Sequence, residues 1–242
     1  MILDKDFCLR ENKMSKRGHN YPGFWVNFEA GEGAGKGTQQ RLLVEYFRRG
    51  GFVVQSGREP GTTPAGEALR RLLQDPSLPE LNPRTEMLGY VMAGIEFFEQ
   101  LIKPPLERGE IYITDRWRYS TEAYQGHGLG IDLDIIRALT KFSCGGAYPD
   151  ITFLLDIEPE AGLSRITGNE FQGNRKDKIE SRGLDFHKRV NQGYREIARQ
   201  NPDRFRVIPY LDGKPDEMHK QIRAYVEEYI KENGLEKVLA RG

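Results

Sequence analysis

The sequence predicts an α/β protein in which a five-stranded parallel sheet is flanked by helices on both faces, giving three layers. Short apolar runs alternate with amphipathic stretches of helical periodicity, and prolines and glycines mark most boundaries between them. Alternation of strand and helix is typical of a parallel sheet covered on both faces. Ligands of such sheets bind at the carboxyl ends of the strands, so residues that follow strands are the first candidates for a site.

The first elements are a strand at residues 24–28 and a helix at 38–49, joined by a glycine-rich segment. Apolar residues at i,i+4 spacing indicate the helix, and two glycines that follow it indicate its end. A second short apolar strand is expected at 52–54. Thr63 precedes a proline and predicts a helix at 64–73, because threonine caps helices and proline suits the first helical position.

In the middle of the chain, a loop with three prolines at 75–83 precedes a long helix at 84–107. Residues 111–114 read Ile-Tyr-Ile-Thr, which is typical of a strand. A further helix is expected at 131–142. Asp115 therefore follows directly on a strand, where a site residue is expected.

The last part of the chain contains two more strands, at 151–155 and 205–208. Pro159 opens a helix after the first of them, because proline is favoured at the first helical position. Helices are also expected at 184–199 and 214–231, where apolar residues recur with helical spacing.

Charge and composition limit the kinds of partner. The chain has 36 basic and 36 acidic residues, so no global field favours nucleic acid or an anionic membrane. No apolar stretch reaches the roughly 18 residues of a membrane span, and the N-terminus lacks the apolar core of a signal peptide. Cys8 and Cys144 are far apart, which argues against a disulfide framework and favours the cytoplasm. We therefore expect small-molecule partners.

One domain is expected over residues 23–233. Residues 1–22 are polar and predict a flexible extension, within which Met14 would serve equally well as a start. Residues 234–242 form a C-terminal tail.

The glycine-rich segment at 28–38 reads Phe-Glu-Ala-Gly-Glu-Gly-Ala-Gly-Lys-Gly-Thr and predicts a phosphate-binding P-loop. Its backbone amides and the helix N-terminus attract an anion, and Lys36 can reach terminal phosphates. Ala30 replaces the usual first glycine, and Gly37 stands where serine or threonine usually follows the lysine. The candidate nucleotide-binding residues are Ala30, Gly31, Glu32, Gly33, Ala34, Gly35, Lys36, Gly37 and Thr38.

Further segments follow in a characteristic order. They are Arg-Glu-Pro-Gly-Thr-Thr-Pro at 58–64, an Asp-Arg-x(3)-Ser-x(3)-Tyr-Gln pattern at 115–126, the strand at 150–156 and Leu-Asp-Phe-His at 184–187. Together with the P-loop, these segments resemble the thymidylate kinase family, over about residues 24–229. The resemblance implies a P-loop NTPase fold, ATP and Mg²⁺ as phosphoryl donor and cofactor, dTMP as acceptor, and a homodimer.

The resemblance also implies site residues. Arg116 corresponds to the arginine that bridges donor and acceptor phosphates, and Glu32 to an acid near the acceptor 3′-hydroxyl. Tyr90 corresponds to a ring that stacks on thymine, while Thr121 and Tyr124 correspond to positions at the pyrimidine and the deoxyribose. The candidate substrate-binding residues are Glu32, Pro60, Tyr90, Arg116, Ser120, Thr121, Tyr124 and Gln125.

Residues 167–178 correspond to a mobile lid, in which Arg175 or Lys176 would supply a catalytic cation. Glu180 corresponds to an acid that orients magnesium-bound water, and Asp115 is a second candidate through water. The candidate catalytic residues are Lys36, Asp115, Arg116, Arg175 and Lys176.

Gly94 is the main departure, because the family usually carries an arginine for the acceptor phosphate there. Three other arginines could replace the missing cation at the acceptor phosphate: Arg58, Arg70 and Arg118. Two alternatives to a dTMP kinase therefore stay open, a related nucleoside monophosphate kinase with another acceptor and a non-catalytic nucleotide-binding protein. Two candidate site residues could also have a purely structural role. Tyr90 could belong to the core, and Glu180 could pair with a neighbouring cation.

Overall fold

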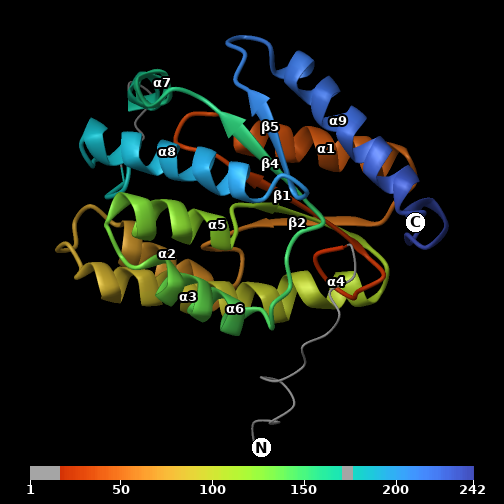
Figure 1. The fold of residues 1–242 in the computed structure, drawn as a ribbon, viewed down its shortest axis with the longest axis horizontal. Helices are drawn as coiled ribbons and strands as arrows, with labels where there is room; N and C mark the ends of the chain where they lie inside the picture. The colour runs from red at the N-terminus through yellow and green to blue at the C-terminus, as the bar shows by residue number, and fades with distance from the viewer. Residues whose placement is uncertain (1–16, 171–176) are drawn as a thin grey trace, which may run out of the picture.

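The sheet is the centre of the protein (Figure 1). A computed structural model describes residues 17–170 and 177–242, and in this part five parallel strands lie in the order β2-β3-β1-β4-β5. The strands are β1 (Phe24–Glu29), β2 (Val54–Arg58), β3 (Ile111–Asp115), β4 (Ile151–Asp156) and β5 (Phe205–Pro209). The predicted five-stranded parallel sheet is therefore confirmed.

Helices cover both faces of the sheet (Figure 1). One apolar core contains inward residues of α1 and α9 against the sheet, and two further cores contain residues of α8 and of the α3–α4 region. The helices are α1 (Lys36–Arg49), α2 (Pro64–Gln74), α3 (Pro83–Phe97), α4 (Lys103–Glu107), α5 (Arg118–Thr121), α6 (Leu133–Ser143), α7 (Pro159–Glu170), α8 (Leu184–Gln200) and α9 (Pro215–Glu232). No helix in the described ranges is long and apolar enough to cross a bilayer.

The prediction of the second strand was wrong. The strand runs over Val54–Arg58, with Val54 opposite Ile111, whereas Phe52 makes only an isolated bridge with Arg241. The strand is polar because β2 is the edge of the sheet, and its backbone pairing with β3 does not require an apolar sequence. The loop that was expected to begin at Arg58 begins one residue later.

Two helical regions also differ from the prediction. The expected helix at 84–107 is divided by a π-helical segment, η2 (Phe98–Ile102), before α4. Pro104 and Pro105 have no N–H to donate to the preceding turn, and a widened turn accommodates their missing hydrogen bonds. After β3, α5 continues into a second π-helical segment, η3 (Glu122–Gly128), which the sequence did not indicate.

Residues 17–22 were expected within a flexible extension, but they dock on the domain. The Arg17 Nε lies 2.7 Å from Asp150 Oδ1, and the His19 Nε2 lies 2.9 Å from Asp150 Oδ2. The Trp25 amide also donates to this carboxylate, at 2.8 Å. Although burial raises the pKa of Asp150, His19 and Arg17 outweigh it and hold that pKa below its usual value. Residues 1–16 lie outside the described residues.

The C-terminal tail packs on the same end of the domain. Leu235, in the short helix η4 (Leu235–Lys237), and Leu239 are buried in the core that contains α9. The Val53 amide donates to the Ala240 carbonyl at 3.0 Å. The tail therefore continues the domain that was expected to end at residue 233.

Substitution of Asp150 tests this docking. Asp150→Asn should lower the free energy of unfolding by about 3 kcal/mol at pH 7, because it removes the buried carboxylate that binds Arg17, His19 and the Trp25 amide. The pKa of Asp150 is lower in the folded state, so this contribution is present above the unfolded value and is lost as the pH falls through the folded value. Urea denaturation at several pH values measures it.

A chain that begins at Met14 is the matched control, because it keeps Arg17 and His19. We expect this chain to retain wild-type stability and activity. An Asp150→Asn variant as stable as the wild type would show that the docked segment contributes nothing to the fold.

Candidate active site

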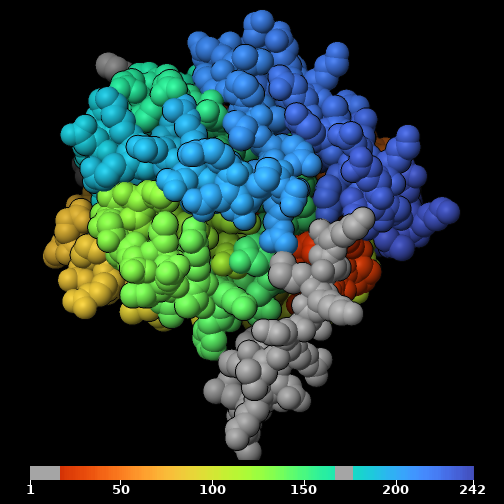
Figure 2. Space-filling view, viewed as in Figure 1, coloured from red at the N-terminus to blue at the C-terminus, as the bar shows by residue number. Residues whose placement is uncertain are grey.

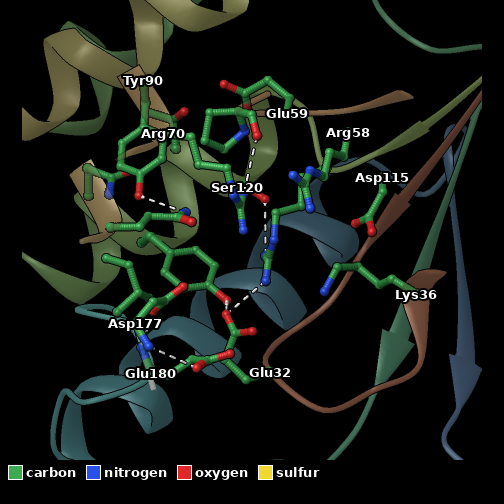
Figure 3. A pocket seen from close by; sticks show the side chains of 17 residues that line it. Glu32, Lys36, Arg58, Glu59, Arg70, Tyr90, Asp115, Ser120, Asp177 and Glu180 are labelled. Atoms are coloured by element: carbon green, nitrogen blue, oxygen red, sulfur yellow. Dashed lines mark hydrogen bonds and ion pairs between the residues drawn. The ribbon is translucent and has the colours of Figure 1, made fainter. Parts of the chain in front are cut away.

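A cavity of about 210 Å³ lies at the carboxyl ends of β1, β2 and β3. Side chains from the P-loop, α2, α3, α5 and η3 point into it (Figure 3). Three strands end at this edge of the sheet, which brings together residues from segments far apart in the sequence, such as Lys36, Pro60 and Arg116.

The predicted P-loop connects β1 to α1. Gly33 has a φ of 72°, and a Cβ atom at this position would lie 2.2 Å from the Gly162 carbonyl oxygen, so only glycine fits. Gly35 also has a positive φ, of 81°, and no side chain caps the helix that follows it. The first amides of α1 therefore keep their hydrogen-bonding capacity for an anion.

Lys36 is the first residue of α1 and lines the cavity, although only 9% of it is exposed. Burial and then the neighbouring Arg116 lower the pKa of Lys36, while Asp115 and Glu32 oppose this change. A phosphate group beside Lys36 and Arg116 would balance their two positive charges. Gly37 and Thr38, by contrast, lie exposed on the first turn of the helix.

Arg116 reaches from the end of β3 to the P-loop. Its Nη2 lies 2.8 Å from Glu32 Oε1, and its Nη1 donates to the Ala30 carbonyl at 3.0 Å and to the Tyr194 hydroxyl at 3.2 Å. The backbone of Arg116 is left-handed, with a φ of 70°, which costs about 1–2 kcal/mol for a residue other than glycine. These contacts hold the guanidinium between the P-loop and the cavity.

Glu29 is fully buried and binds Ser120 and Tyr194, two residues whose hydroxyls also contact Arg116. Its Oε1 accepts from the Trp117 amide at 2.9 Å and from Asn27 Nδ2 at 3.0 Å. Its Oε2 accepts from the Ser120 hydroxyl at 2.6 Å and from the Tyr194 hydroxyl at 3.0 Å. Burial raises the pKa of Glu29, and the donors oppose that change. An acid at the end of an apolar strand was the only sequence signal for this residue.

Glu32 experiences the opposite electrostatic effect. Burial alone would raise its pKa, but Arg116 and Lys36 outweigh it and lower the pKa to about 2. The Tyr124 hydroxyl donates a short hydrogen bond to the same carboxylate, and the Tyr124 ring lies 4.9 Å from the guanidinium carbon of Arg116. Glu32 is therefore ionised and fixed beside both cations.

The far end of the cavity is less charged. Tyr90 is largely buried, and Gln74 donates to its hydroxyl at 3.4 Å. The Arg70 Nη1 donates to the Pro60 carbonyl at 3.2 Å. Ser120, Thr121 and Gln125 line the same cavity from one side of α5 and η3.

Glu59 was missed as a site residue, although it directly follows a strand. Only 4% of it is exposed, and burial, followed by the charge of Glu29, raises its pKa to about 8. The Cα of Gly94 lies nearby, since a Cβ added there would meet only Glu59 Oε1, at 4.0 Å. Gly94 therefore leaves room where the family usually has an arginine.

Not all predicted residues come together. Asp115 lies beside Lys36, whereas Glu180 lies across the cavity near Asp177 and Glu32 (Figure 3). The described residues contain no group of three His, Cys, Asp or Glu side chains suited to a metal ion. Asp115 Oδ1 is buried without a hydrogen-bond partner in the part of the chain that the structure describes, so it is available to water or a ligand. Arg175 and Lys176 lie outside the described residues.

A P-loop beside a cavity, with Lys36 and Arg116 between them, defines a P-loop protein that can hold two phosphate-bearing ligands together. A family model described as thymidylate kinase matches residues 28–222. The chain belongs to the thymidylate kinase family.

Relatives and a solved structure agree with this assignment. A thymidylate kinase of Roseiflexus sp. (strain RS-1) is 41% identical over 216 residues, which cover 85% of this chain and 94% of the relative. A thymidylate kinase of Exiguobacterium sp. (strain ATCC BAA-1283 / AT1b) is 37% identical and covers 89% and 99%, respectively. The crystal structure of thymidylate kinase from Ehrlichia chaffeensis superposes with a TM-score of 0.68 at 31% identity, covering 85% of this chain and 98% of that one.

Glu59 gives the site a measurable pH dependence. Its folded pKa of about 8 exceeds the unfolded value of about 4.3, so between these values only the folded state keeps the proton. Wild-type stability should therefore fall by up to about 1.4 kcal/mol per pH unit in this window because of this group. Glu59→Gln should remove that slope, as urea denaturation at pH 6, 7 and 8 would detect. If the free energy of unfolding changed with pH in the same way in both proteins, Glu59 would not be the buried, protonated carboxyl group described here.

Proposed function

We propose that this protein transfers the γ-phosphoryl group of ATP to dTMP, giving ADP and dTDP for dTTP synthesis. The position of Arg116 carries this proposal. It contacts the P-loop through Ala30 and Glu32 and lines the adjacent cavity, so one guanidinium can reach both the donor and the acceptor phosphates. Phosphoryl transfer requires such positioning and positive charge rather than covalent chemistry by the protein.

On the donor side, the P-loop amides and Lys36 would bind the ATP phosphates. Asp115 would hold Mg²⁺ through water, since its buried Oδ1 has no protein partner, and Glu180 is a more distant second candidate. When bound, Mg²⁺ neutralises charge on the phosphates. Arg175 or Lys176 would add a further cation when the lid closes, and closure would exclude water that could otherwise accept the phosphoryl group.

On the acceptor side, Tyr90 would stack on thymine, with Pro60, Thr121 and Gln125 around the base. The ionised Glu32 would accept a hydrogen bond from the sugar 3′-hydroxyl. The Tyr124 ring, fixed by its hydroxyl on Glu32, would occupy the space that a 2′-hydroxyl needs.

Gly94 favours one alternative, a nucleoside monophosphate kinase with another acceptor, because this position beside Glu59 lacks the cation that the resemblance implies. Arg70 best replaces it, because Arg70 lines the cavity with its guanidinium near Pro60. Arg58 also lines the cavity, but it pairs with Glu67 at 3.3 Å. Arg118 does not line this cavity.

We also propose a homodimer, and the cytoplasm as its location. Helices α2, α3 and α6 carry large apolar side chains that are exposed in the single chain. They are Leu72, Leu88, Met92, Ile135 and Phe142. Apolar residues gathered on adjacent helices are typical of an interface with a second copy.

ADP release across a panel of monophosphates tests the function. With dTMP, dUMP, dCMP, AMP and the ribose form of TMP as acceptors, kcat/KM should be highest for dTMP. A preference for AMP or dCMP would favour the alternative kinase, and no turnover with any acceptor would indicate a non-catalytic nucleotide-binding protein.

Lys36→Ala should lower kcat by on the order of 10² or more, because the charge acts on the transferring phosphates. The melting temperature should change little. Arg41→Ala is a matched control on the same helix, since Arg41 is exposed and forms only an i,i+4 pair with Glu45. If the Lys36→Ala variant retained most of the wild-type activity, Lys36 would have no role in phosphoryl transfer.

Tyr124 should determine sugar preference. Tyr124→Ala should lower the ratio of kcat/KM for dTMP to kcat/KM for the ribose form of TMP, because it opens space at the 2′ position. Tyr124→Phe keeps the ring and should retain most of that ratio. Equal ratios in the wild type and the alanine variant would assign Tyr124 to packing alone.

A further inference from the structure

A second cavity lies on the opposite side of α5 and η3 from the candidate active site. Its volume is about 340 Å³, larger than the active-site cavity, and residues of α5, α6 and the end of α8 line it. Ser120, Thr121 and Tyr124 face the active site, whereas Arg118 and Glu122 line this second cavity. Both α6 and α8 lie on the face that Figure 2 shows. The proposed reaction uses none of the residues that line this cavity.

Positive charge predominates in the second cavity. Arg118, Arg137 and Lys141 line it, and Glu122 is the single acid among its described lining residues. Glu122 is already paired, since its Oε2 lies 2.9 Å from the Arg137 Nε. Two cations, Arg118 and Lys141, therefore remain without a carboxylate partner in the described part of the chain.

Arg118 is the unusual member of the pair, because only 4% of it is exposed. Its guanidinium carbon lies 4.0 Å from the centroid of the Tyr148 ring, and Nη1 lies 4.0 Å from Cys144 Sγ. Its Nε is buried without a hydrogen-bond partner. A ring face and a sulfur atom replace only part of the hydration that a buried guanidinium loses.

Two other largely buried arginines of this protein have the counter-charge that Arg118 lacks. Arg116 lies 2.8 Å from Glu32, and Arg182 lies 2.7 Å from Glu86. Buried charges in proteins are usually paired, because an unpaired one is costly. Among the described residues, Arg118 therefore lacks the counter-charge that an anion in the cavity would supply.

We infer that this cavity is a second anion-binding site, which takes a phosphate group of a small-molecule ligand through Arg118 and Lys141. Tyr119 also lines the cavity, and its buried hydroxyl has no hydrogen-bond partner among the described residues, so it is a candidate neutral donor. A phosphate has enough oxygen atoms to accept from all three groups, and guanidinium binds phosphate in a bidentate geometry.

Inorganic pyrophosphate is the probe, and calorimetric titration of the full chain is the measurement. The wild type should bind two equivalents, one at the P-loop and one in the second cavity. Lys36→Ala should abolish the first and keep the second. Arg118→Met keeps the apolar stem and should weaken the second site at least about tenfold, as loss of a charge-assisted contact does.

Lys141→Gln is the second variant, for use if Arg118→Met does not fold. Lys141 is exposed, so this substitution should not affect folding. It should weaken the second site about threefold, whereas Lys220→Gln, an exposed change on α9, should leave it unchanged. If the wild type bound a single equivalent of pyrophosphate, and Lys36→Ala abolished that binding, the proposal of a second site would be wrong. The proposed kinase reaction would not be affected by this result. A second equivalent unaffected by either cavity variant would also overturn it.

Discussion

The buried carboxylate of Glu29 is the interaction on which the site depends. It ends β1 and accepts hydrogen bonds from the strand itself, from the turn after β3, from α5 and from α8. A carboxylate with four donors is stabilised despite complete burial, and without it the Trp117 amide would lose this acceptor. One side chain thus joins three regions that are far apart in the sequence, namely β1, residues 117–120 and α8.

Arg116 benefits most from this arrangement. Its left-handed backbone is strained, and the next residue, Trp117, donates its amide to Glu29. The guanidinium pairs with Glu32 and also acts on Glu29 through its charge, yet burial raises the pKa of Glu29 while the cations lower that of Glu32. Such opposed environments are typical of functional sites, where strain and charge are held by the surrounding structure.

Local sequence signals predicted much of the fold and of the site. Alternating apolar runs predicted the parallel sheet. Glycines marked the P-loop, and two of them, Gly33 and Gly35, have the left-handed backbone that favours glycine. The strand at Val54–Arg58 was misplaced because a sheet edge tolerates polar residues, so its pairing leaves little pattern in the sequence.

Long-range contacts explain the remaining differences. Tyr194 lies in the helix that apolar spacing predicted at 184–199, and that spacing gave no indication that its hydroxyl contacts Glu29 and Arg116. The docking of Arg17 and His19 depends on Asp150, which is more than 130 residues away in sequence. No local pattern reports such pairs, since they form only when the sheet is assembled.

The most direct test of this account is the single-turnover rate of a Glu29→Gln variant with ATP and dTMP, measured beside its melting temperature. The amide would point an N–H₂ group at donors that require an acceptor, so Arg116 would lose its fixed position. The account predicts that the rate falls by on the order of 10² or more, as for loss of a preorganised electrostatic contact, in a variant that still folds. A folded variant that reacts at the wild-type rate would contradict the central role of Glu29.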